Sequence, residues 1–245
     1  MFEKGSVLRD GKLTAVRNVC GQRYLYTPLG KDGVRDWSTD DYLNRLEDDA
    51  GTLWPSLVTE IISLKEPAVR SLLSRFIAVM HLRNVEIFNL IDRTVLLRDQ
   101  LFGPLTPEQL ADRGPDLPDP TDATSIFTHT LISGIDRIFE SFAAKQWYVL
   151  CASSDFFVTS DRPVMFFPNS AGKAGVGVAG STAIFPLSPQ RMLIMVDQAN
   201  PLPNEYVTIE SFADRAGKFG TFNREFLNRS IRFALGPTPI RFADF

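Results

Sequence analysis

The chain has 245 residues, of which 44% are hydrophobic and 22% charged. This composition is ordinary for a globular protein and excludes disorder along the whole length. The formal net charge is −3, so the basic excess of a general phosphate-binding surface is missing.

Neither end of the sequence nor its interior predicts a targeting or membrane segment. The start, Met1 to Ser6, lacks the apolar core of a secretory signal. No apolar run reaches the roughly 18 residues of a membrane helix. Cys20 and Cys151 lie far apart and lack metal-ligand spacing. We therefore expect a cytoplasmic protein with reduced thiols and no membrane partner.

Residues 1–36 predict a small β-meander. Two short strand-like runs flank Asp10-Gly11, a dipeptide that favours a tight hairpin because both positions tolerate positive φ. A further short strand is expected at residues 23–26, followed by a turn-rich exit.

Residues 38–144 show apolar residues at helical spacing and predict about three helices. The expected helices are 38 or 39 to about 61, 67–97 and 125–144. Ser38 has capping-box spacing to Asp41, which favours a start there. Pro55 is expected to kink or interrupt the first helix. A Pro- and Asp-rich connection with one helical turn, 107–112, precedes the third.

Residues 145–206 are rich in aromatic and β-branched runs and predict an antiparallel sheet. Strands are expected at 147–150, 156–159, 164–167, 182–187 and 192–196. A Gly-rich loop is expected at 169–180 and a hairpin turn at 188–190. A final helix is predicted from about Ile209 to Ala234 within a C-terminal part, 207–245. Because helices precede strands, we predict one α+β domain over residues 1–245.

Gly175, Gly177 and Gly180 match the literal spacing of a dinucleotide-binding loop. That fingerprint needs a strand before it and a helix N-terminus after it, whereas here a loop precedes and a strand follows. We therefore expect a plain loop and no dinucleotide. His81 and His129 lack a nearby second ligand, so no metal site is predicted. No cofactor is expected.

A basic cluster lies near the C-terminus and comprises Lys218, Arg224, Arg229 and Arg232. Asp214 and Glu225 interrupt it, which favours a solvated helix face. Nucleic acid is therefore not an expected partner. In the alternative case, these four basic residues would form its contact surface.

Arg83 is the most informative candidate residue, because it continues an apolar helical stripe that includes Phe76 and Met80. A guanidinium cannot lose its charge there, so it needs a carboxylate partner or a wet cleft. Glu47 is the candidate partner. In an antiparallel helical hairpin that turns near Lys65, Glu47 and Arg83 are equally far from the turn and therefore lie level.

A second polar group follows an apolar run and consists of Thr159, Ser160, Asp161, Arg162 and Pro163. Asp161 is expected at a strand end, where side chains often enter a site. Two interpretations stay open. Asp161 either caps local backbone N–H groups in an Asx-type turn, or it meets Arg83 in a shared polar pocket.

The sequence resembles a known bacterial family, the domain-of-unknown-function 4238 (DUF4238) family. The motifs that carry the resemblance, in order, are Glu47, Phe76-Ile77-Ala78 to Arg83, Phe157 to Val164, Phe185-Pro186-Leu187-Ser188-Pro189 and Asn223. The resemblance supports the predicted order of elements and the choice of Glu47, Arg83 and Asp161. It implies no activity.

Two departures from the family pattern bear on the site. Members typically open with a His-Tyr-Val-Pro-like segment, and this sequence begins after it. The family usually has Asn where Arg162 stands here. We therefore expect any site that uses that histidine to be missing.

Two functions remain open, and the favoured one is a non-enzymatic binding or regulatory module. It fits the missing nucleophile, metal and phosphate signatures. Its binding residues would be Arg83, Ser160, Asp161, Arg162 and Asn223. The alternative is a hydrolase that acts on a nucleic acid or nucleotide and has Glu47, Arg83 and Asp161 as catalytic residues. Its carboxylates would serve as base or metal ligands, and Arg83 would steady an anion.

Overall fold

The computed structural model describes residues 25–30, 33–112, 117–197, 204–209, 220–231 and 234–236. Its helices are α1 (Ser38–Thr59), α2 (Pro67–Leu82), α3 (Val85–Phe102), α4 (Pro107–Ala111), α5 (Ala123–Ala143) and α7 (Gly220–Arg229). Its strands are β1 (Gln146–Ala152), β2 (Thr159–Ser160), β3 (Met165–Phe167), β4 (Thr182–Ser188), β5 (Arg191–Val196), β6 (Tyr206–Ile209) and β7 (Ala234–Leu235).

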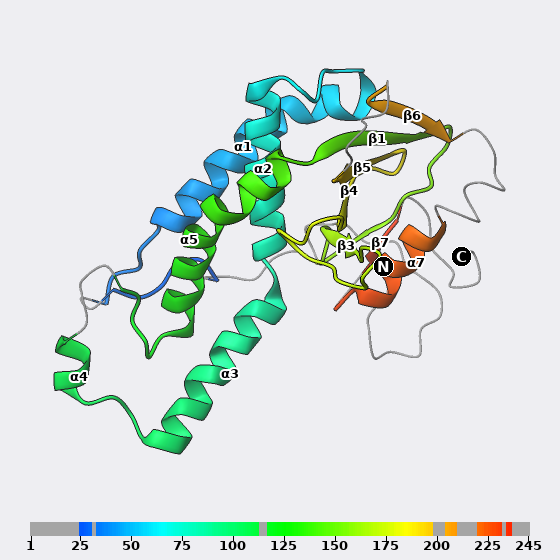
Figure 1. The fold of residues 1–245 in the computed structure, drawn as a ribbon. Coiled ribbons are helices and arrows are strands. Elements are labelled where there is room, and N and C mark those ends of the chain that lie inside the picture. The colour runs from blue at the N-terminus through cyan, green and yellow to red at the C-terminus, as the bar shows by residue number, and fades with distance from the viewer. Residues whose placement is uncertain are drawn as a thin grey trace.

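The helices and the sheet form two adjoining parts of the molecule (Figure 1). Helices α1, α2 and α5 lie side by side against one face of the sheet, while α3 and α4 extend away from it. The predicted α+β class is confirmed by the described elements. Most of the predicted β-meander lies outside the described residues. Within them, residues 25–36 contribute an isolated antiparallel bridge between Leu29 and Arg35.

The main sheet has five strands in the order β3-β4-β5-β1-β6. Its first three pairings are antiparallel, and β4 and β5 form the predicted hairpin. The prediction of a purely antiparallel sheet is wrong at one edge, where β6 runs parallel to β1 with Val149 opposite Tyr206. Turn signals predict hairpins between neighbouring strands, but they carry no information on a strand that joins the far edge.

Side chains of the sheet alternate between two buried layers. Val149 and Leu193 pack against the helices, together with Leu73 and Ile77 of α2. Leu150 and Met192 pack on the opposite face against Phe226 of α7 and its surroundings. Because both faces are covered, the strands read as nearly continuous apolar runs rather than as an alternating pattern.

The second predicted helix is in fact two. It ends at Leu82, and α3 begins at Val85, with Asn84 as its N-cap. The Asn84 Oδ1 atom accepts a hydrogen bond of 2.9 Å from the Glu86 N–H. An asparagine side chain competes with the helical backbone in this way, so apolar spacing alone predicted one helix where the cap makes two. With the short α4, residues 38–144 hold five helices rather than about three.

The first helix also departs from its prediction in detail. It starts at Ser38, as expected, but its N-cap is Trp37 and no side chain caps it. The Asp36 Oδ1 atom, just before the helix, accepts a hydrogen bond of 2.9 Å from the Ser38 N–H. Pro55 does not interrupt it, because α1 continues to Thr59. The predicted turn at 107–112 and the predicted third helix match α4 and α5 closely.

Two further predictions near the C-terminus are wrong. Tyr206–Ile209 is a strand and Ala234–Leu235 is another, so the predicted helix 209–234 shrinks, in the described part, to α7. Of the predicted strand 156–159, only Thr159 pairs, in the short ladder between β2 and β7.

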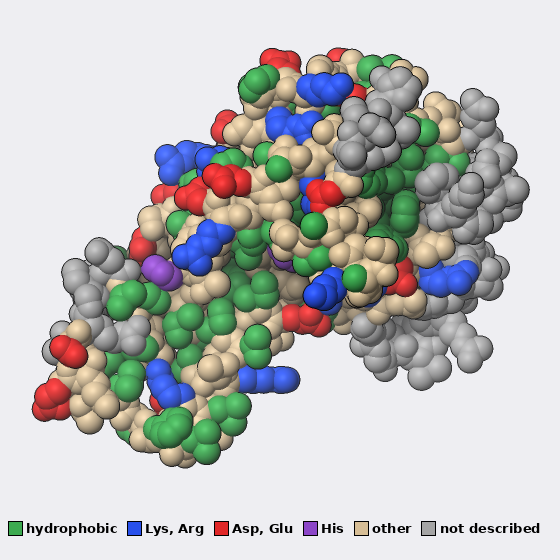
Figure 2. Space-filling model, viewed as in Figure 1, with side chains coloured by type: hydrophobic (Ala, Val, Ile, Leu, Met, Phe, Trp, Pro, Cys, Tyr) green, Lys and Arg blue, Asp and Glu red, His purple; other side chains and the backbone are tan. Residues whose placement is uncertain are grey.

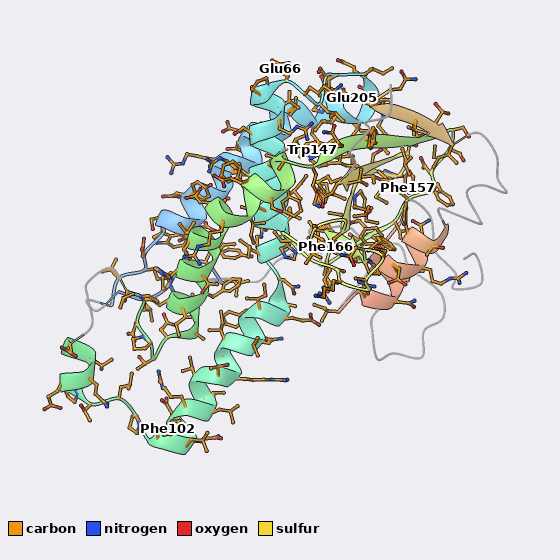
Figure 3. The ribbon with its side chains drawn as sticks, in the orientation of Figure 1. Glu66, Phe102, Trp147, Phe157, Phe166 and Glu205 are labelled. Atoms are coloured by element: carbon orange, nitrogen blue, oxygen red, sulfur yellow. The ribbon has the colours of Figure 1, made fainter. Side chains whose placement is uncertain are left out.

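The far end of α3 carries exposed apolar side chains. Leu97, Leu101 and Phe102 are largely exposed, and Figure 3 shows Phe102 at the tip, remote from the sheet. In Figure 2, apolar side chains gather over this helical arm, whereas the upper part of the molecule shows charged side chains in scattered groups.

Candidate functional site

The predicted pair of Glu47 and Arg83 is present. The Arg83 guanidinium forms an ion pair and a hydrogen bond with the Glu47 Oε1 atom, across the α1–α2 hairpin. Both side chains keep some contact with solvent, with exposed fractions of 29% for Arg83 and 43% for Glu47. The apolar stripe therefore brings Arg83 to the edge of the helical layer, where its charge is neutralised.

Tyr26 completes this group. The Arg83 guanidinium lies 5.3 Å from the centre of the Tyr26 ring, which also stacks on Phe127 at 6.0 Å. Burial raises the pKa of the Tyr26 hydroxyl, and Arg83 opposes that rise. Burial disfavours the charge of Arg83, but Tyr26 and Glu47 outweigh it and raise the pKa of Arg83. The guanidinium stays charged and ties residue 26 to the helices.

Asp161 has a different partner. Its Oδ1 atom accepts a hydrogen bond of 2.9 Å from the Ile231 N–H, just after α7. The local turn is made instead by Ser160, whose Oγ accepts from the Arg162 N–H and donates to the Arg162 carbonyl, both at 3.1 Å. These contacts connect Asp161 to α7 and place Arg162 on the opposite side of the turn. A catalytic role that joins Asp161 to Glu47 and Arg83 stays a prediction.

Asn223 lies fully buried in α7 and binds backbone. Its Nδ2 donates to the Phe156 carbonyl at 2.8 Å, and its Oδ1 accepts from the Val158 N–H at 3.1 Å. One amide therefore does what a neighbouring strand would do for this extended segment. The Phe156 and Phe157 N–H groups bond instead to the Pro189 carbonyl, each at 2.8 Å, so the backbone of 156–158 is satisfied outside any β-ladder. A ligand-binding role for Asn223 stays a prediction.

A cavity of about 190 Å³ lies where the end of α2, the Arg162–Phe166 segment, the Gly-rich loop and α7 meet. The polar side chains that line it are His81, Asn84, Arg162 and Arg229. The other lining residues are Met80, Val164, Met165, Phe166, Ala174 and Gly175. Figure 3 shows Phe166 at the junction of β3 with the lower end of α2. The cavity thus brings together the end of α2, residues 162–175 and α7, which are far apart in sequence.

The two arginines of the cavity are held from outside it. Arg162 Nη1 lies 3.0 Å from Glu86 Oε2, and Arg229 Nε lies 2.7 Å from Glu225 Oε2. Arg229 also donates from Nη1 to the Phe166 carbonyl at 3.3 Å. Neither glutamate is among the cavity-lining residues. Each guanidinium group is therefore held by partners of its own, while both arginine residues line the cavity.

His81 lies edge-on to Phe166, with ring centres 5.1 Å apart. Burial, with a smaller contribution from Arg162, lowers the pKa of His81 to about 4. The imidazole is therefore neutral near pH 7 and presents one donor and one acceptor. Neither of its ring nitrogens makes a hydrogen bond within the part of the chain that the structure describes.

The wall formed by the Gly-rich loop is held by buried polar contacts. Lys145 Nζ donates to the Ser181 carbonyl and to Asp197 Oδ2, both at 2.9 Å, and Asp197 also accepts from the Gly180 N–H at 2.8 Å. Gly180 has φ +73°, and an added Cβ there would lie 3.3 Å from that of Asn169, so this position favours glycine. The predicted loop is confirmed, with β4 rather than a helix after it.

Of the predicted basic cluster, Arg224 and Arg229 lie on α7, while Lys218 and Arg232 fall outside the described residues. Arg229 faces the cavity just described. Among the residues that the structure describes, no group of three or more His, Cys, Asp or Glu side chains is placed to hold a metal ion.

Sequence reasoning named Arg162 but missed the role of His81 and Asn84, and it assigned Arg229 to another surface. His81 is one residue from the end of α2, and Asn84 caps the next helix. An asparagine inside a long helical pattern was the available signal, since it favours caps over helix interiors. No local pattern connects either residue to Arg229.

None of the described helices is both long enough and apolar enough to cross a membrane. No curated protein and no solved structure matches the chain. A family model described as protein of unknown function (DUF4238) matches residues 8–237, as the ordered motifs predict, and the chain therefore belongs to this family.

Proposed function

We propose that the protein is a non-enzymatic binding module whose ligand occupies the cavity between α2, the Arg162–Phe166 segment and α7. The observation that carries the proposal is the convergence of His81, Asn84, Arg162 and Arg229 on one small enclosed space. Convergent polar groups with spare hydrogen-bonding capacity, set in an apolar wall, are the usual form of a ligand site. Arg162 is the residue that this proposal shares with the binding residues expected from sequence.

The cavity is supported in advance of any ligand. Ser160 fixes the backbone of Arg162, Asn84 is fixed by its capping bond to Glu86, and Lys145 anchors the loop wall. A preformed site loses less conformational entropy on binding than one that must be ordered. This favours binding as the purpose of the arrangement.

The test uses the full chain and a library of small polar fragments, followed by backbone amide chemical shifts. We expect fragments to perturb Asn84, Arg162 and Gly175. Ala174→Phe should fill the cavity and abolish these shifts. Ala171→Phe, on the same loop but outside the lining, should retain them. Fragments that bind equally well to Ala174→Phe would contradict the proposal.

The hydrolase alternative draws its support from the three residues Glu47, Arg83 and Asp161. The contacts of the described residues join two of them and tie the third to Ile231. The experiment is a screen with bis(p-nitrophenyl) phosphate in the presence of Mg²⁺, Mn²⁺ or Zn²⁺. The binding module predicts no turnover above buffer. Turnover that Asp161→Asn removes, without a change in thermal stability, would favour the hydrolase.

A further inference from the structure

We infer that the cavity's ligand is a small oxyanion, a carboxylate or a phosphate, bound between the guanidinium groups of Arg162 and Arg229. This inference rests on the proposed function and specifies its ligand class. Both arginines line the same cavity, although one follows β2 and the other belongs to α7. None of the described residues that line the cavity is acidic. The described lining therefore contributes two arginines and no carboxylate, and the glutamates that pair with these arginines lie outside it.

The guanidinium groups retain donors for a ligand. Each has five N–H donors in a planar fork. Arg162 directs Nη1 to Glu86, and Arg229 directs Nε to Glu225 and Nη1 to Phe166. The remaining donors match the paired oxygens of a carboxylate or phosphate, which arginine binds with two parallel hydrogen bonds. Glu86 and Glu225 hold the two guanidinium groups in place and do not themselves line the cavity.

Two uncharged groups complete the recognition. Asn84 uses Oδ1 to cap α3, which leaves its Nδ2 amide as a donor. His81 offers one donor and one acceptor, and the acceptor suits a hydroxyl group or a protonated oxygen next to the anion. An oxyanion that also carries a hydroxyl therefore satisfies more of the lining than a simple inorganic anion.

The volume limits the size of the ligand. A cavity of about 190 Å³ holds the equivalent of roughly six water molecules, at about 30 Å³ each. Drug-sized ligands occupy sites of about 300–1,000 Å³. A small hydroxy acid or a free phosphate therefore fits inside the cavity, whereas a nucleotide would extend out of it. The apolar wall of Val164 and Phe166 accepts a short carbon chain.

The experiment titrates the full chain with sodium phosphate, sodium glycolate and neutral glycolamide at constant ionic strength. Backbone amide shifts of Asn84, Arg162 and Gly175 are followed. We expect phosphate or glycolate, or both, to bind at least about tenfold more tightly than glycolamide, because hydrogen bonds to a charged group contribute about 1.5–3 kcal/mol. If phosphate binds more tightly than glycolate, the ligand class is phosphates. If glycolate binds more tightly, the ligand class is organic acids.

Matched variants assign the binding to the cavity. Arg162→Gln and Arg229→Gln should each weaken binding of the preferred anion by at least about tenfold, and Arg162→Lys should restore part of it. Arg224→Gln, on the exposed face of α7, is the control and should change affinity less than twofold. Thermal unfolding of each variant checks that the fold is retained.

Three outcomes would overturn the oxyanion inference. The first is anion binding that both glutamine variants leave intact, and the second is glycolamide binding as tightly as both phosphate and glycolate. The third is no binding of any anion when the fragment library still perturbs the cavity. The second and third outcomes would contradict the oxyanion inference but not the proposal of a binding module. Failure of the library itself would remove the proposed function.

Discussion

At the scale of single residues, several polar side chains here bind backbone groups that lie outside helices and ladders. Asn223 holds the 156–158 segment through both atoms of its amide, and Ser160 holds Arg162. Arg191 donates to the carbonyl groups of Leu57 and Glu60 at the end of α1. These contacts fix extended or terminal backbone that has no ladder or helix partner.

The first prediction concerns Asn223. Asn223→Leu should lower the free energy of unfolding by about 3 kcal/mol, because it leaves a buried N–H and a buried carbonyl without partners. Urea unfolding measures the change. Asn89→Leu, at an exposed position of α3, is the control and should shift stability by less than about 0.5 kcal/mol. A loss of unfolding free energy below about 1 kcal/mol for Asn223→Leu would contradict this prediction. It would show that water hydrogen-bonds the backbone groups in place of the amide.

The second prediction concerns the pH dependence of stability through His81. Its pKa is about 4 in the folded protein, against an ordinary value of 6.5. As pH falls from 6.5 towards 4, the unfolded chain takes up a proton that the folded protein does not, so stability decreases. Burial is the larger cause of this low pKa, and the charge of Arg162 adds to it.

His81→Leu should therefore lose about 1–2 kcal/mol less stability than the parent chain between pH 7 and pH 4.5. Urea unfolding at the two pH values measures this difference, and subtraction removes the titration of the carboxylates. His129→Gln, at an exposed position of α5, should behave as the parent. Equal pH dependence in His81→Leu and the parent would mean that the imidazole charges freely in the folded state.

At the scale of elements, sequence predicted periodic segments well and interruptions poorly. Helix α5, strands β4 and β5 and the hairpin between them follow from spacing and turn chemistry. The break at Asn84 and the edge strand β6 do not, because each depends on a single capping bond or a distant partner. At Pro55 the sequence predicted an interruption that does not occur, because the packing of α1 outweighs the local effect of the proline.

The third prediction concerns the loop that walls the cavity. Lys145→Met should lower the free energy of unfolding by about 1–3 kcal/mol, because the Ser181 carbonyl loses its donor and Asp197 loses its ion pair. Hydrogen exchange at the Gly180 amide should also quicken. Lys173→Met, in the exposed part of the same loop, serves as the matched control. An unchanged exchange rate of the Gly180 amide would mean that Lys145 does not stabilise the loop.

At the scale of the whole molecule, the cavity forms where the helical part meets the sheet (Figure 1). Its polar residues come from the end of α2, the α3 cap, the turn after β2 and α7, so none is near all the others in sequence. This explains why sequence predicted the Glu47–Arg83 pair, which lies within one helical hairpin, but not the cavity. A pairing inside a hairpin follows from equal rise along two helices, whereas a four-segment junction follows only from the assembled fold.

The most direct test of the central claim is a crystal of the full chain soaked in sodium selenate, whose selenium marks an oxyanion by anomalous scattering. We predict a peak between the guanidinium groups of Arg162 and Arg229, within about 4–5 Å of each central carbon because the oxygens lie at hydrogen-bond distance. The peak should be absent from Arg229→Gln and present in Arg224→Gln. An empty cavity at full soak, or a cavity peak that persists in Arg229→Gln, would contradict the account.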